Sequence, residues 1–155
     1  MRRSEREVTS AERISLIMAR AGVLYLALHN DPAPYVVPVY FGFEPGRLYV
    51  HGAREGTRLS LLRARPDVGF CAVAEAQVVE GASACDFTAR AESVMGTGTG
   101  RVVTDEAERV HGLDLIMAHA VRSAPTGGFS YRPGSLERTS VLAIDITSIT
   151  GKRIG

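Results

Sequence analysis

Cysteine is scarce in this sequence. The chain contains only Cys71 and Cys85, and their separation matches neither a metal-binding pair nor a redox pair. We therefore expect two reduced thiols in or near the core. Histidine offers no alternative, because the four histidines are scattered and lack an acidic residue at the spacing of metal ligands. The sequence thus predicts no metal site.

An excess of charge of either sign is also missing. The 18 lysines and arginines are balanced by 17 aspartates and glutamates, which leaves a formal net charge of +1. Attraction of a whole protein to nucleic acid or to an anionic membrane needs a much stronger field. We therefore expect no nucleic-acid partner and no membrane partner, and any anion site must be local.

Long hydrophobic runs are absent as well. The sequence has no uninterrupted apolar run of about 18 residues, and the residues before Arg13 carry several charges without an apolar segment. These features predict neither a membrane span nor an export signal, so we expect a cytoplasmic protein. The length of 155 residues fits a single domain, residues 1–155, that is large enough to bury a core.

What is present is a series of β patterns. Alternating and β-branched residues predict six strands, joined by turns rich in Gly, Pro, Asn and Asp. The predicted strands are 23–30, 31–43 after a turn at its start, 47–51, 67–74, 85–103 and 139–152. Periodic apolar residues predict three helices, one ending near Ala21, one at 57–65 and one at 105–121. The stretches 75–84 and 123–135 are predicted to be irregular.

The order of these elements favours one architecture. The strands follow one another in antiparallel runs, and the helices are inserted singly. This order is typical of a small β-barrel with helical attachments and not of a doubly wound parallel sheet.

The segment "LYVHGAREGTRLSLL", residues 48–62, is the most informative stretch. A strand ending near Gly52 is followed by a turn and by a helix that begins near Thr57. The free N–H groups and the dipole of a helix N-terminus suit an anion, and Arg58 adds a forked cation. The spacing matches neither the Walker pattern nor the dinucleotide fingerprint. From the residues alone, a plain strand-turn-helix corner is the competing interpretation.

Two further residues have alternative interpretations. Pro38 lies inside a β run, where it cannot donate a ladder hydrogen bond, so it indicates either an edge strand or bulge, or a backbone left open for a flat ligand. His51 ends a strand, where it serves either the structure or a ligand. Hydrolysis is not indicated, because no nucleophile elbow and no pair of carboxylates at a suitable spacing occurs.

Several segments together resemble a known family. These are "PYVVPVYF", "LYVHGAREGTRL", "RPDVGFCAV", "ACDFTARAESVMGTGTGRVV" and "SITGKR". They are similar to the pyridoxamine-phosphate-oxidase-like FMN-binding split barrels, in particular the nitroimidazole-resistance branch. The resemblance implies a mainly β protein with helices, a six-stranded antiparallel split β-barrel that binds FMN at the interface of a homodimer.

The resemblance also implies a set of site residues. The strand beside the flavin ring corresponds to Val36, Val37, Pro38 and Val39. The phosphate site corresponds to Thr57 and Arg58, with His51, Gly52 and Ala53 along the approach. Ser93 lies near the region that closes over the ring. Arg58 stands where relatives commonly have lysine, and this exchange preserves the positive charge. Ala91 stands where relatives have a larger residue, so the resemblance does not determine the identity of the substrate.

The function implied is that of an FMN-dependent oxidoreductase. Small side chains at Ala89, Ala91, Gly96 and Gly98 suggest room for a small flat electron acceptor, such as a nitroaromatic or a quinone. His51 is the expected catalytic residue, and NADH and NADPH are candidate electron donors. The residues that bind pyridoxal phosphate in true pyridoxamine-phosphate oxidases are not recognisable. The alternatives are a non-catalytic flavin- or haem-binding protein and a cofactor-free interaction protein on the same fold.

Overall fold

The computed structural model describes residues 4–121 and 128–155. A 3-10 turn, Ser4–Arg6, precedes the first strand. The strands are β1 (Glu7–Val8), β2 (Leu24–Leu28), β3 (Tyr35–Val39), β4 (Phe41–Glu44), β5 (Arg47–Ala53), β6 (Asp67–Val79), β7 (Thr88–Val102) and β8 (Thr139–Ile154). The helices are α1 (Ala11–Arg20), α2 (Thr57–Ala64), α3 (Glu106–Val121) and α4 (Pro133–Arg138). Among the described residues, no helix is long and apolar enough to cross a membrane.

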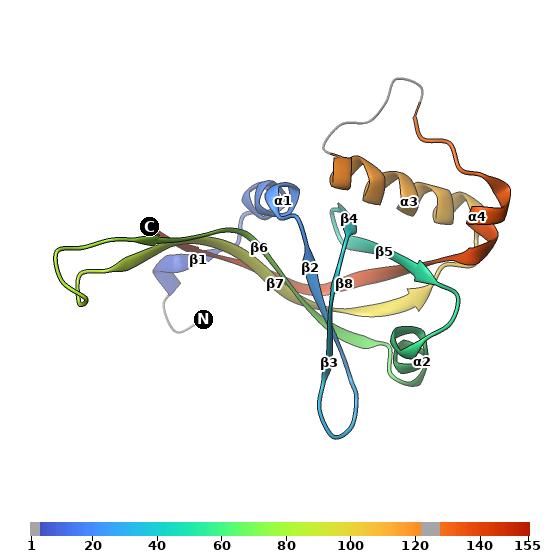
Figure 1. Cartoon of the computed structure of the whole chain (residues 1–155), viewed down its shortest axis with the longest axis horizontal. Coiled ribbons are helices and arrows are strands. Elements are labelled where there is room, and N and C mark those ends of the chain that lie inside the picture. Colours follow the sequence, from blue (N-terminus) through green and yellow to red (C-terminus); the bar gives the residue numbers. More distant parts are fainter. Residues whose placement is uncertain (1–3, 122–127) are drawn as a thin grey trace.

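The strands form one antiparallel sheet in the order β3-β2-β6-β7-β8-β5-β4, with β1 added to β8. The two end strands, β3 and β4, follow each other in the sequence with only Tyr40 between them. The chain itself therefore connects the two ends of the sheet (Figure 1). The predicted class, an antiparallel split β-barrel with helices, is confirmed.

The strand count differs from the prediction of six for local reasons. The predicted strand 31–43 is two strands, because the chain leaves β3 and enters β4 at Tyr40. Strand β1 has only two residues, which are too few to show an alternating pattern in the sequence. Pro38 lies on β3, which pairs only with β2, so the edge-strand interpretation of this proline is confirmed.

Two predicted irregular stretches contain regular structure. β6 continues to Val79, where it pairs with Thr88, so the irregular stretch predicted from residue 75 is wrong over its first half. Pairing with β7 forms this part of the strand although most of its side chains are exposed. The six-residue α4 begins at Pro133, within the predicted connection 123–135, ends at Arg138 and is too short to show a helical period. Residues 123–127 of that connection lie outside the described residues.

The core is divided between the two faces of the sheet. The interior of the barrel is filled by apolar side chains, chiefly Leu24, Leu26, Leu28, Phe41, Leu48, Val50, Phe70, Val94, Leu142 and Ile144. A second cluster lies where α3 covers the outer face of β5 and β8, and includes Tyr49, Leu113, Ile116, Val141 and Ala143. Because β5 and β8 are buried on both faces, their buried segments are continuous and do not alternate.

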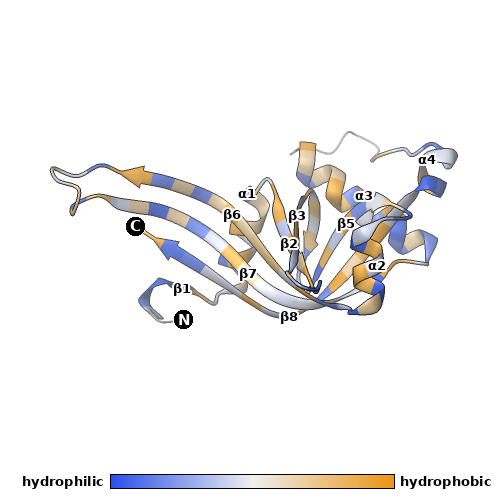
Figure 2. Cartoon of the chain, turned by 60° about the horizontal axis from the view of Figure 1, so that its bottom comes forward, coloured by the Kyte–Doolittle hydropathy of each residue, from blue (hydrophilic) through white to orange (hydrophobic). Residues whose placement is uncertain are grey.

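Beyond the barrel, β6, β7 and β8 extend as a long ribbon, and α1 lies against its base (Figures 1 and 2). The turn at the far end of the ribbon holds Cys85, which is exposed, so the prediction of a thiol in or near the core is wrong for this residue. Cys71 lies on β6 and is half-buried, and burial raises the pKa of its thiol.

Candidate functional site

The N-terminus of α2 is open. Helix α2 begins at Thr57, and the residue before it, Gly56, has a φ angle of 128°, a conformation that favours glycine. Gly56 provides no side chain to cap the helix. The amides of the first turn and the positive end of the helix dipole are therefore available to an anion.

Arg58 is held beside this helix end by β5. Its Nη2 donates a hydrogen bond of 2.8 Å to the carbonyl oxygen of His51. A Cβ atom at Gly52 would overlap the Arg58 guanidinium, so the missing side chain of Gly52 makes room for it. Burial lowers the pKa of Arg58, and Tyr35 opposes part of that effect. Arginine nevertheless stays protonated, and its remaining N–H groups are available to a ligand.

These features surround a cavity of about 240 Å³, which we call the phosphate cradle. Its lining consists of Tyr35, Val37, Ala53, Glu55, Gly56, Thr57, Arg58 and Leu59. Four of the predicted site residues therefore come together here, namely Val37, Ala53, Thr57 and Arg58. Sequence reasoning missed Tyr35, although it lies two residues from Val37 and shares its face of β3 by strand alternation.

One residue of the cradle opposes an anion. Glu55 places a carboxylate in the lining, and like charges in one site repel. Its neighbour Arg54 does not pair with it, because Nη1 of Arg54 donates to the carbonyl oxygen of Glu137 at 2.9 Å. Arg58 and the helix end therefore supply the positive potential of the cradle.

The other predicted residues lie outside the cradle. Val36 and Pro38 are exposed, and Val39 is buried in the core. Ser93 lies on β7, opposite Val73 and Lys152. Of the predicted ring-side residues, Val37 lines the cradle, whereas Val36, Pro38, Val39 and the closing residue Ser93 do not. Their part in binding a flavin stays a prediction.

His51 contributes its backbone and not its ring to the cradle. Gly52 faces Arg58, and successive side chains of a strand point to opposite faces, so the imidazole of His51 points away from it. The side chain is exposed. Partial loss of hydration and the nearby Arg58 cation both lower the pKa of the imidazole. A ligand that meets this ring must extend over the outer surface of β5.

The glycines of β7 do not form the flat surface that the sequence suggested. A Cβ at Gly98 would lie 2.6 Å from the carbonyl oxygen of Asp145, and one at Gly96 would overlap Ser148 and the ring of Phe70. Both glycines therefore accommodate the close approach of β8 and of a core side chain. The expectation of an open face at these two positions is wrong.

Comparison with known proteins identifies the family. The family model described as pyridoxamine 5'-phosphate oxidase matches residues 10–153, which is nearly the whole chain. The chain belongs to this family. Among curated proteins, no sequence matches it significantly.

Solved structures show the same fold. A proposed 5-nitroimidazole antibiotic resistance protein from Bacteroides thetaiotaomicron is 28% identical, with a TM-score of 0.82 over 94% of this chain and 85% of that one. An FAD and heme binding protein from Mycobacterium smegmatis is 24% identical, with a TM-score of 0.83 over 96% of this chain and 73% of that one. The flavocytochrome Anf3 from Azotobacter vinelandii is 21% identical, with a TM-score of 0.78 over 96% and 69%. The predicted family is confirmed, and the likeness to the proposed nitroimidazole-resistance protein supports the predicted branch.

Proposed function

We propose that the chain is a flavoprotein that holds the phosphate of FMN in the phosphate cradle. The observation that carries this proposal is the uncapped N-terminus of α2 beside a half-buried Arg58 that is fixed against Gly52. A phosphate dianion needs several N–H donors and a compensating cation, and this corner supplies both. Membership of the family and the names of two similar structures, a flavocytochrome and an FAD and heme binding protein, support a flavin as the ligand.

Each part of the cradle has a distinct task in this proposal. The amides of the first turn of α2 and the guanidinium of Arg58 bind phosphate oxygens, and the hydroxyl groups of Thr57 and Tyr35 are further donors. Glu55 weakens phosphate binding unless its carboxylate turns toward water. In this proposal the edge strand β3 lies next to the flavin ring. Pro38 has no backbone N–H group, so no donor is left without a partner there. When bound, the flavin supplies the electron or hydride transfer.

We further propose that the flavin site is completed by a second copy of the chain. The cradle has about 240 Å³, which is below the range of about 300–1000 Å³ for sites that enclose a whole small ligand. A single protomer can therefore enclose the phosphate end but not the ring.

An apolar band on the outer face of the barrel suits such a dimer. Tyr25 lies opposite Pro38 and Cys71 in the sheet, and Cys71 lies opposite Met95. Large side chains of this band are exposed, Tyr25 at 47% and Met95 at 42%. Contiguous exposed apolar surface is typical of interfaces, and this supports a dimer through the band. Ser93 is two residues from Met95 and shares its face by strand alternation, so in a dimer it can reach the flavin of the partner.

The reaction we propose is the reduction of a small planar acceptor, a nitroaromatic or a quinone. The likeness to the proposed nitroimidazole-resistance protein supports this choice. NADH and NADPH are the candidate donors. His51 is the candidate group that donates a hydrogen bond or a proton to the acceptor, because an imidazole exchanges protons near neutral pH.

A visible absorption spectrum of the purified protein is the first test. Flavin bands support the proposal. A Soret band favours the alternative of a haem-binding protein, which the names of two similar structures also suggest. A colourless protein that takes up neither cofactor contradicts both.

Anaerobic mixing of the dithionite-reduced flavoprotein with metronidazole or menadione then tests the reaction. Rapid return of the flavin bands is the expected result, and a His51→Gln variant should be slower by about 10²-fold or more if the imidazole is the proton donor. Bands that return at the same rate in the variant remove His51 from the mechanism. A reduced flavin that is stable to both acceptors contradicts the proposed reaction.

A further inference from the structure

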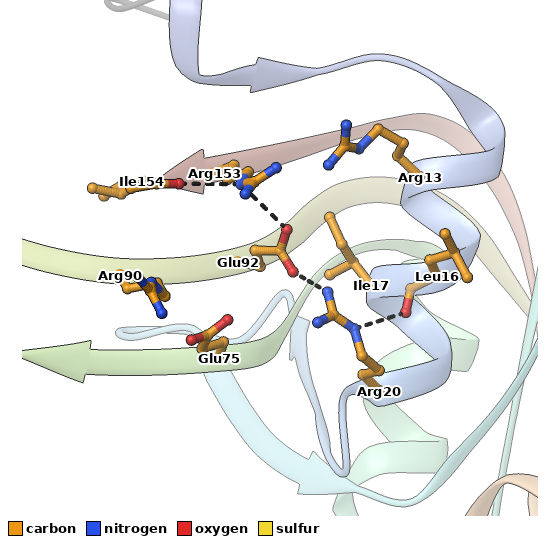
Figure 3. A pocket seen from close by; sticks show the side chains of 10 residues that line it. Arg13, Leu16, Ile17, Arg20, Glu75, Arg90, Glu92, Arg153 and Ile154 are labelled. Atoms are coloured by element: carbon orange, nitrogen blue, oxygen red, sulfur yellow. Dashed lines mark hydrogen bonds and ion pairs between the residues drawn. The ribbon is translucent and has the colours of Figure 1, made fainter.

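A second cavity among the described residues is larger than the phosphate cradle. It lies between α1 and the base of the ribbon formed by β6, β7 and β8, and has a volume of about 500 Å³ (Figure 3). Its charged lining is unusual, since it contains four arginines and two glutamates, namely Arg13, Arg20, Arg90, Arg153, Glu75 and Glu92. We call this cavity the arginine cleft.

The arginines of the cleft come from three elements. Arg13 and Arg20 are seven residues apart on α1, so they lie two turns apart on the same face of the helix. Arg90 comes from β7 and Arg153 from β8. The cleft is therefore formed only when the helix packs against the ribbon, and the sequence around each arginine gives no sign of it.

A β-bulge adds the second carboxylate. The pairing of β6 with β7 shifts by one residue between Val73 and Glu75, so that Glu75 lies opposite Glu92. Without this shift Ala74 would lie opposite Glu92. Bulges commonly redirect a side chain in this way. Two carboxylates directly opposite each other repel, so cations are needed at this position of the sheet.

Glu92 connects the elements that form the cleft. It is only 9% exposed, and it forms ion pairs with Arg20 of α1 and with Nε of Arg153 at 3.7 Å (Figure 3). Nε of Arg153 also donates to the carbonyl oxygen of Gly155 at 3.1 Å. These contacts attach the helix to β7 and β8, and they occupy two of the four arginines.

The other charged groups are unpaired. Within residues 4–121 and 128–155, the side chains of Arg13, Arg90 and Glu75 form no hydrogen bond and no ion pair. Figure 3 shows Arg13 and Arg90 on opposite sides of Glu92. The cleft as a whole has four positive and two negative side chains, and its unpaired groups also carry a net positive charge.

We propose that the arginine cleft binds a small polyanion that carries phosphate or carboxylate groups, with Arg13 and Arg90 as its ligands. The volume lies within the range of small-molecule sites, and the planar fork of arginine matches both kinds of anionic group. Glu92 points into the cleft from β7, whereas its neighbour Ser93 points to the opposite face. The site is thus separate from the proposed flavin site and independent of the proposed function.

Nuclear magnetic resonance of the ¹⁵N-labelled protein tests this inference. The protein is saturated with FMN, so that the phosphate cradle is filled, and is titrated with pyrophosphate in one series and with citrate in another. We expect saturable shifts of the Arg13 and Arg90 Nε–H signals. The series with the lower dissociation constant identifies the preferred group, phosphate or carboxylate. The readout is specific to each residue, so it is valid even if FMN does not bind.

The test variant combines Arg13→Gln and Arg90→Gln. The control variant is Arg63→Gln on α2, which removes a surface charge outside the cleft. The double variant should bind at least tenfold more weakly, and the control should bind as the wild type does. The inference is wrong if neither anion causes saturable shifts up to about 10 mM, if the shifts occur only at Arg58, or if the double variant binds unchanged.

Discussion

The phosphate cradle and the arginine cleft both depend on arginine, but they use its charge differently. In the cradle, Arg58 donates to a backbone carbonyl and binds no carboxylate of the part of the chain that the structure describes, so its charge is available to a ligand. In the cleft, Glu92 binds two of the four arginines. We therefore expect that an arginine-rich cavity is not by itself a stronger anion site than a single arginine at an open helix end. What matters is how much of the charge is already compensated within the protein.

The two sites also differ in how they are assembled. Most of the cradle comes from one continuous stretch, residues 53–59, with β3 as the opposite wall. The cleft is assembled from α1, β6, β7 and β8. Loss of Arg58 should therefore affect ligand binding in the cradle, whereas loss of Glu92 in the cleft should affect the attachment of α1.

The largest expected effect is on the cradle. Arg58→Ala should weaken FMN binding by about 1.5–3 kcal/mol, the range for a hydrogen bond to a charged group. Quenching of FMN fluorescence on binding provides the dissociation constants. Arg54→Ala is the matched control, because Arg54 points to Glu137 and not into the cradle. An equal loss in both variants would show that net charge, and not the position of Arg58, determines affinity.

A smaller effect is expected in the cleft. Glu92→Gln should lower the free energy of unfolding by about 1–2 kcal/mol, because a nearly buried carboxylate loses its ion pairs with two half-exposed arginines. Urea unfolding followed by circular dichroism measures this change, with the exposed Glu80→Gln as control. FMN affinity should stay unchanged. Equal stability of the two variants would mean that Glu92 does not hold α1 to the ribbon.

The pair between Arg20 and Glu92 should contribute less than that. The side chain of Arg20 is 51% exposed, and pairs with an exposed partner are typically worth about 0.2–1 kcal/mol. A double-mutant cycle with Arg20→Gln and Glu92→Gln measures this coupling from the same unfolding experiments. A coupling near zero would assign the stabilisation by Glu92 to Arg153 instead.

The smallest effect concerns pH. The pKa of His51 is lower in the folded protein than its ordinary value of about 6.5, so the unfolded chain binds more protons below that pH. The stability associated with a neutral His51 is therefore complete above pH of about 6.5 and is lost as the pH falls below it. Melting temperatures at pH of about 8 and 5 should differ more in the wild type than in His51→Gln. The same difference in both proteins would contradict the shift.

The sequence could predict those parts of the molecule that depend on local patterns. Runs of apolar and β-branched residues between turns identified β2, β5 and β8, and the turn with its helix start placed Thr57 and Arg58 together. The same local reasoning failed for the second half of β6, because its pairing with β7 and not its composition makes it a strand. It also failed for Gly96 and Gly98, whose small size serves the approach of β8 and the packing of Phe70.

The cleft lay beyond prediction for a related reason. Arg13 and Arg153 are near the two ends of the sequence, and only the packing of α1 on the ribbon brings them together. The direction of Glu75 depends on a bulge that strand alternation does not reveal. For His51 the sequence predicted more than the structure supports. A motif assigned its side chain to the site, whereas strand geometry places only its carbonyl oxygen beside Arg58.

The central claim is that the cradle recognises a phosphate group, and the most direct test compares FMN with riboflavin, which lacks only that phosphate. Fluorescence titrations of the wild-type protein should show FMN binding at least tenfold more tightly than riboflavin, because the helix end and Arg58 together provide several charge-assisted hydrogen bonds. In Arg58→Ala the preference for FMN should become much smaller. Equal affinities of the wild-type protein for FMN and riboflavin would contradict the account.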